Sequence, residues 1–202
     1  MSTAAQKSVQ VLAALLLVSC AGTKLVDHWR DPAWKGSAYK KVLVFGISEQ
    51  PNVRQAFENE FVKKIKEQGA DAVPGHRFIP EAGKVDKARV LGAVEQSGAD
   101  AVMVTRLVKR ENVIKPTRPS APTPEEKWGG MYSDAWATRY EPTATTTETV
   151  VILETKLWDV KTQAPVWTGT SEVTNPSPKR VEELTDSLSK AMIASLRESG
   201  ML

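Results

Sequence analysis

The sequence predicts a single α/β domain over residues 41–202, with the element order β-α-β-α-β-β-β-α. Three observations predict it. Apolar, strand-like runs alternate with helical patterns, two helix exits share the sequence Gly-Ala-Asp-Ala-Val at 69–73 and 98–102, and a β-hairpin pattern follows later. Because β-α-β crossovers are right-handed and join parallel strands, we expect a mixed five-stranded sheet of order 2-1-3-4-5 with helices on both faces.

The first half of the domain contains two strand–helix units. The run 42–47 is apolar throughout, as in a strand buried on both faces. Pro51 suits the first turn of a helix. That helix carries an apolar stripe at four-residue spacing, formed by Val53, Phe57, Phe61 and Ile65. A short strand at 72–73 stops at Pro74, which confines it to an edge of the sheet.

The second unit begins with a helix over 86–96, whose core side we expect to consist of Val90, Leu91 and Val94. Gly98 ends this helix, because glycine readily adopts the positive φ of a helix terminus. The next strand covers 101–108.

The second half of the domain begins with a long interruption over 115–147, which has prolines at its start and threonines at its end. A loop this long is uncommon inside a compact domain. Alternating strands at 149–159 and 166–173 then form a hairpin. Ser177-Pro178 starts the last helix with a capping residue and a first-turn proline. Its expected inward face is Val181, Leu184, Leu188, Ala191, Met192 and Ser195.

The amino-terminal segment is typical of an exported lipoprotein. Residues 9–18 form a short apolar run that ends at Leu17-Val18-Ser19-Cys20, and Cys20 is the only cysteine of the chain. A run of ten residues is too short to span a bilayer as a helix. The alternatives are an ordinary signal peptide, or a buried helix with a core cysteine. We expect residues 1–19 to be a lipoprotein signal peptide and Cys20 to be acylated, for example with palmitate.

Residues 20–40 are then expected to be the lipidated amino terminus and a tether. Ala21 follows the cysteine where an aspartate would retain an enterobacterial-type lipoprotein at the inner membrane. The sequence therefore predicts a lipid anchor at the periplasmic face of the outer membrane.

Composition limits the classes of function. Lys and Arg number 27 against 24 Asp and Glu, so a net charge of +3 is too small to indicate nucleic-acid binding. The two histidines, His28 and His76, stand in no zinc-like spacing. No phosphate-binding loop or nucleophile elbow occurs. We expect no metal, no cofactor and no enzyme activity.

The aromatic residues of the long loop are the candidate partner-binding site. Trp128, Tyr132 and Trp136 lie four residues apart, beside Gly129-Gly130. Trp and Tyr are enriched where proteins bind partners. The alternative is that the loop folds back and these rings cover the sheet.

The chain resembles a group of proteobacterial lipoproteins of unknown function. The resemblance rests on the lipobox, Trp29-Arg30-Asp31-Pro32, the segment 40–44, the repeated helix exits and the hairpin around Leu157-Trp158-Asp159. The order of elements is also similar to the amino-terminal domain of TolB and to lipoprotein activators of penicillin-binding proteins. These resemblances imply a fold and a cellular location. Cys20 is the one residue of this chain to which they assign a function.

We therefore expect a non-enzymatic, lipid-anchored module that binds an envelope protein and serves in the assembly or maintenance of the envelope. The alternative is a small-ligand-binding protein or hydrolase. It would use a cleft at the carboxyl ends of the strands, near Ser48, Gly75 and Arg106, where ligands bind in open α/β sheets. A purely structural lipoprotein is a third possibility.

Overall fold

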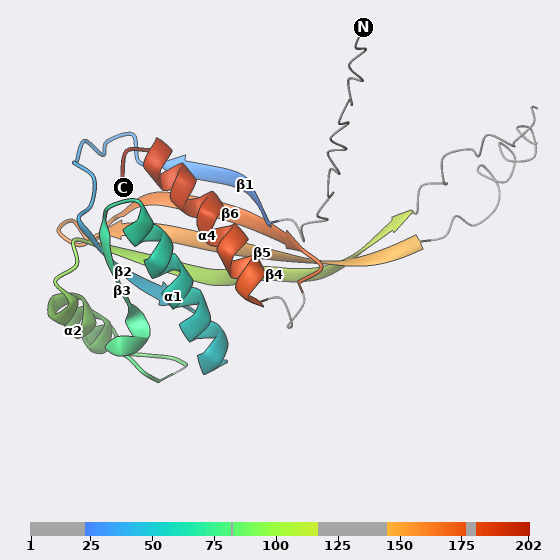
Figure 1. The fold of residues 1–202 in the computed structure, drawn as a ribbon, viewed down its shortest axis with the longest axis horizontal. Coiled ribbons are helices and arrows are strands. Elements are labelled where there is room, and N and C mark those ends of the chain that lie inside the picture. Colours follow the sequence, from blue (N-terminus) through green and yellow to red (C-terminus); the bar gives the residue numbers. More distant parts are fainter. Residues whose placement is uncertain (1–22, 82, 117–144, 177–180) are drawn as a thin grey trace, which may run out of the picture.

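A six-stranded mixed sheet is the centre of the computed structural model, which describes residues 23–81, 83–116, 145–176 and 181–202. The strand order is β1-β6-β5-β4-β2-β3 (Figure 1). The strands are β1 (Thr23–Arg30), β2 (Lys41–Gly46), β3 (Asp71–Pro74), β4 (Ala101–Pro116), β5 (Thr145–Asp159) and β6 (Pro165–Thr174). The helices are α1 (Pro51–Glu67), the 3-10 turn η1 (Gly75–Arg77), α2 (Lys87–Ser97) and α4 (Val181–Glu198).

The expected five-stranded sheet of order 2-1-3-4-5 is wrong, because the segment expected to be a tether contains β1. This strand pairs antiparallel with β6 from Thr23↔Val173 to Arg30↔Trp167. A register shift between Leu25 and Asp27 breaks its alternation. Leu25 packs against the core, while most of the strand is exposed. An exposed edge strand with a bulge therefore lacks the period-two pattern by which strands are recognised in a sequence.

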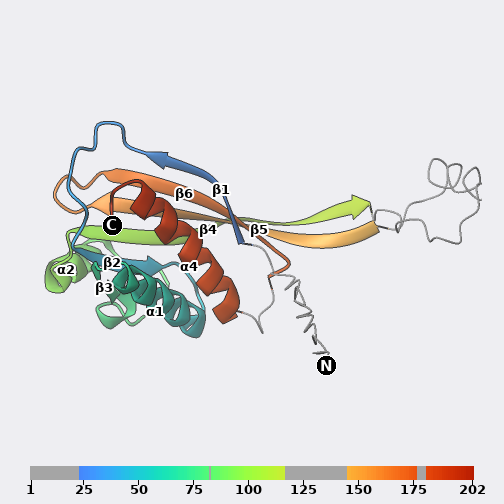
Figure 2. The same ribbon diagram turned by 45° about the horizontal axis from the view of Figure 1, so that its top comes forward.

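The two faces of the sheet are covered unequally. Val42 and Val44 of β2 contribute to the larger core, under α1 and α4, while Leu43 and Phe45 belong to a smaller core under α2. This alternation explains why β2 is apolar throughout. Trp167 of β6 is fully buried in the larger core. Figure 2 shows α1 and α4 side by side across the sheet.

Two helices differ from expectation in the side chains that they bury. In α1 the buried residues are Arg54, Glu58, Phe61 and Ile65, so two charged side chains join the expected apolar stripe on the inner face. Phe57 packs partly buried against the core, and Val53 is half-buried. In α2, Leu91 is 40% exposed. The ends of α2 are as expected, since the Asp86 carboxylate accepts a 2.8 Å hydrogen bond from the Arg89 N–H and Gly98 has φ 62°.

Strands β4 and β5 are longer than the sequence indicates. Their pairing continues from Ala101↔Asp159 to Pro116↔Thr145, so residues 115–116 and 145–147 belong to strands rather than to the expected loop. The last helix is described from Val181, and its expected cap at Ser177-Pro178 lies outside the described residues.

Candidate functional site

The most prominent feature of the described chain is a two-stranded ribbon, which we define as residues 109–116 of β4 with 145–152 of β5. At the base of the ribbon, residues 150–152 of β5 still pair with β6, which ends at the pair Val150↔Thr174. Beyond that pair, the two ribbon strands form ladder pairs only with each other. Figures 1 and 2 show the ribbon projecting past the helices and the other strands. It is therefore a part of the described fold that another molecule can reach from both faces.

The ribbon carries one large exposed apolar side chain among charged ones. Ile114 is 68% exposed, the highest value among the large hydrophobic residues that the structure describes. Lys115 pairs with Glu148 across the ribbon, and Lys109 pairs with Glu111 on the same strand. The hydrogen bond that Lys115 donates to the Glu148 carboxylate raises the pKa of Lys115, which stays charged. This surface can contact an apolar group flanked by polar or charged ones.

A buried polar cluster lies at the carboxyl ends of β2 and β3. The Glu58 side chain is fully buried, and its Oε1 accepts hydrogen bonds from Arg54 Nε at 2.8 Å and Gly46 N at 3.1 Å. Its Oε2 lies 2.6 Å from His76 N and 2.8 Å from His76 Nδ1. Arg54 also donates through Nη1 to the Glu81 carbonyl at 2.6 Å. The cluster ties α1 to the ends of two strands.

This cluster occupies the place where the alternative hypothesis put a cleft. Ser48 is half-buried, and its hydroxyl and the backbone of Gln50 bond each other locally. Gly75 is buried, and Arg106 is ion-paired with Glu154 at 2.8 Å. The structure does not bring these three expected residues together around a hollow. The Glu58 cluster is not among the residues expected from the sequence. The available signal for it was Gly75-His76, which directly follows a strand.

An open hollow lies at the opposite end of the sheet from the ribbon, lined by Trp34, Tyr39, Asp100 and Asp159 among others. Trp34 Nε1 donates to the Tyr39 hydroxyl at 3.1 Å, and that hydroxyl donates to Asp159 Oδ2 at 3.1 Å. Burial raises the pKa of Tyr39 to about 12, and the neighbouring Asp159 carboxylate adds to this shift. These contacts fasten the segment after β1 to the domain.

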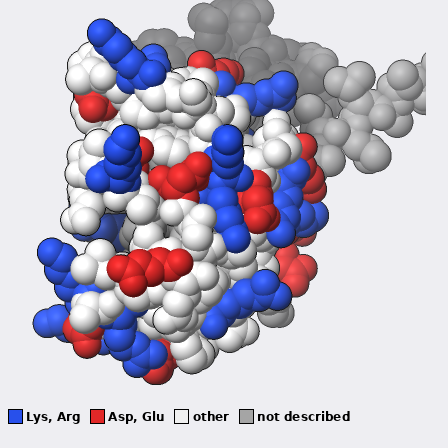
Figure 3. All heavy atoms as spheres, turned by 90° about the vertical axis from the view of Figure 1, so that its left-hand side faces the viewer, with Lys and Arg blue, Asp and Glu red and all other residues white. Residues whose placement is uncertain are grey.

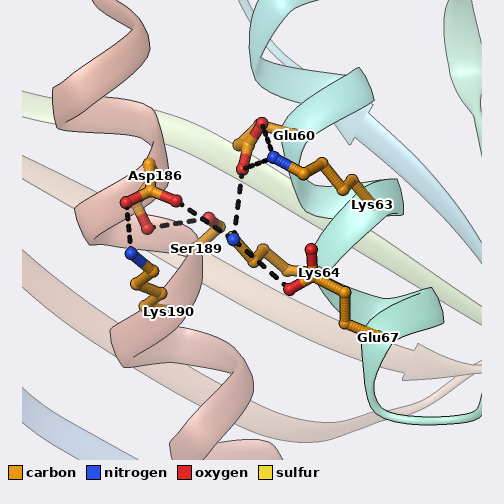
Figure 4. A network of polar contacts seen from close by, with 7 residues as sticks. All are labelled: Glu60, Lys63, Lys64, Glu67, Asp186, Ser189 and Lys190. Carbon is orange, nitrogen blue, oxygen red and sulfur yellow. Dashed lines mark hydrogen bonds and ion pairs between the residues drawn. The ribbon is translucent and has the colours of Figure 1, made fainter.

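A second hollow lies between α1 and α4, beside a network of charges (Figure 4). Lys64 Nζ lies 3.1 Å from Asp186 Oδ1 and 3.3 Å from Glu67 Oε2. Lys190 approaches Asp186 Oδ2 at 2.6 Å, and the hydrogen bonds from Lys190 and Lys64 lower the pKa of Asp186. The network joins two helices through paired charges. Figure 3 shows the end opposite the ribbon, where charges of both signs are interspersed.

Four expected site residues lie outside the described residues, namely Cys20, Trp128, Tyr132 and Trp136. Their roles stay predictions. Within the ranges that the structure describes, no group of three or more His, Cys, Asp or Glu side chains is placed to hold a metal ion. In the same part of the chain, no helix combines the length and hydropathy that crossing a membrane requires.

Comparison with known proteins shows a similarity in the path of the backbone to solved structures. No protein-family model and no curated protein matches the chain. Among solved structures, it is similar to PelC from Paraburkholderia phytofirmans, which was crystallised as a dodecamer. The identity is 18% and the TM-score 0.45, over 85% of this chain and 95% of that chain. It is also similar to lipoprotein GNA1162 from Neisseria meningitidis, at 14% identity and a TM-score of 0.40, over 78% and 98%. At these TM-scores the likeness carries no inference about activity or assembly.

Proposed function

We propose that this chain is a lipid-anchored envelope protein that captures a protein partner with its β4–β5 ribbon and the segment 117–144 that the ribbon carries. The observation that supports the proposal is the ribbon itself, which extends beyond the last residue of β6. Paired strands hold their side chains in fixed positions, so a ribbon presents contact residues at a small entropic cost. Cys20 would carry the lipid, and Trp128, Tyr132 and Trp136 would supply the aromatic contacts.

The outer membrane, the periplasmic face and a role in envelope assembly or maintenance belong to this proposal, because they rest on the sequence around Cys20 and on resemblance. The similarity to the TolB domain and to activators of penicillin-binding proteins likewise stays a prediction, as does the absence of enzyme activity. The buried Glu58 cluster adds nothing to the alternative of a hydrolase. Its carboxylate is fully buried and already engaged by Arg54 and by two backbone N–H groups.

Site-specific photocrosslinking in intact cells tests the proposal. A photoreactive amino acid replaces Tyr132 in one strain and the exposed Lys161, in the β5–β6 turn, in a second strain. The proposal predicts one discrete crosslinked protein at 132 and none at 161. In the Trp128→Ala/Trp136→Ala background the crosslink at 132 should weaken while the abundance of the protein is unchanged. Identical crosslinks at 132 and 161 would contradict the proposal.

A further inference from the structure

The spacer between the expected acylation site and the folded domain is very short. Strand β1 begins at Thr23, whose first pairing is with Val173 of β6. Two residues separate Cys20 from this strand. Three residue steps span at most about 11 Å. If Cys20 carries the lipid, as the proposed function requires, the start of β1 lies within that distance of the bilayer surface.

The register of the sheet shows at which end of the sheet β1 begins. Thr23 pairs with Val173, Val173 pairs with Val151, and Val151 pairs with Arg110. The start of β1 is therefore level with the base of the ribbon. The ribbon continues from Arg110 to Pro116, which corresponds to about 20 Å at the usual rise of a strand. The ribbon therefore reaches farther than the spacer, in the direction from which the lipid arrives.

The reach of the spacer and the length of β1 exclude the reverse orientation, in which the ribbon points away from the bilayer. Strand β1 has eight residues and is about 27 Å long. Turning the ribbon away from the membrane would require the spacer to run back along all of β1, and β1 is more than twice as long as the spacer can reach.

The side chains of the ribbon suit the surface of a phospholipid bilayer. Ile114 is mostly exposed, and strand alternation puts Arg110 on the same face of the ribbon. Lys109 and Lys115 lie on the opposite face, paired with the acids Glu111 and Glu148. An apolar side chain can enter the boundary between headgroups and acyl chains, while a neighbouring Arg side chain extends to lipid phosphates. We propose that one face of the ribbon, the face of Ile114 and Arg110, lies against the phospholipid surface to which the lipid tethers the chain, with Ile114 as its apolar contact. The opposite face, which carries Lys115 and Glu148, is left to the partner of the proposed function.

Single-cysteine labelling of the lipidated, full-length protein tests this inference. A Cys20 whose sulfur is bonded to the lipid as a thioether takes no thiol dye, so each introduced cysteine is a unique label. An environment-sensitive dye is placed at Ile114→Cys, and at Thr147→Cys, which is paired with it across the ribbon. Lys161→Cys at the opposite end is the matched control. The proteins are reconstituted in vesicles of phosphatidylethanolamine and phosphatidylglycerol that contain brominated lipid.

The inference predicts a blue-shifted spectrum and loss of fluorescence by quenching at 114 and 147, with neither effect at 161. A competing orientation would place the β1 edge on the membrane, where Val26 is 44% exposed. Quenching of a dye at Val26→Cys without quenching at 114 would overturn the inference, as would no quenching at any position. The protein without introduced cysteines is treated with the dye in parallel. Uptake of dye by its Cys20 would show that the lipid anchor is absent, which is a failure of the proposed function and not of the orientation inferred here.

Discussion

Substitution of the buried Glu58 should destabilise the protein through the charge that it leaves behind on Arg54. Both side chains are almost completely buried, at 0% and 7% exposure. Glu58→Met keeps the side-chain volume similar, so the cavity contribution is small. Removing one partner of a buried ion pair typically costs about 3–5 kcal/mol. That is a large part of the roughly 5–15 kcal/mol by which a domain is stable.

The double variant Arg54→Met/Glu58→Met removes the second charge as well. Replacement of a whole buried pair by apolar side chains is often close to neutral. The N–H groups of Gly46 and His76 still lose their acceptor, so a loss of roughly 1–3 kcal/mol should remain. The double variant should therefore be more stable than Glu58→Met alone.

Urea unfolding, followed by tryptophan fluorescence to which the buried Trp167 contributes, measures these differences. Lys63→Met is the matched control on the same helix, because the Lys63–Glu60 pair is exposed and should contribute about 0–1 kcal/mol. A double variant no more stable than Glu58→Met would refute the reasoning, because the energy would then lie in the backbone hydrogen bonds rather than in the buried charge.

Four further predictions concern pH, packing, helix propensity and helix capping. The raised pKa of Tyr39 should keep its contribution to stability complete below pH 10 and remove it between pH 10 and 12, so Tyr39→Phe should flatten that alkaline loss in urea titrations. Gly169→Ala would place a methyl group into the Trp167 ring and should cost about 1–3 kcal/mol. By contrast, Gly92→Ala in α2 meets its nearest atom at 4.0 Å and should stabilise by about 0.5–1 kcal/mol. Asp86→Ala should cost about 1 kcal/mol, because α2 loses its N-cap. Thermal unfolding of each variant checks the last three values.

The parts of the fold that the sequence predicts are those in which the pattern and the packing agree. Strand β2 is apolar on both sides because a core lies on each, and Gly98 ends α2 with the positive φ that glycine tolerates. The parallel pairing of β2 with β3 and β4 follows from the helical crossovers that connect these strands.

The parts that could not be predicted are those whose side chains have no core to face. Strand β1 is an exposed edge with a bulge, and the ribbon is polar because no helix covers it. Such strands show no alternation that distinguishes them from a loop. Arg54 and Glu58 give the opposite problem, since charged residues on a helix normally indicate its outer side, whereas here they bury each other. The roles of Trp128, Tyr132 and Trp136 stay predictions, outside the described residues.

The pairing of β1 with β6 joins the first strand of the chain to the last one. During synthesis the amino terminus emerges first, and the partner strand of β1 becomes available only when almost the whole chain has followed. Until then, β1 has no place in the sheet. Contacts this distant in sequence also slow folding, so completion of the sheet should be a late event in the maturation of the protein.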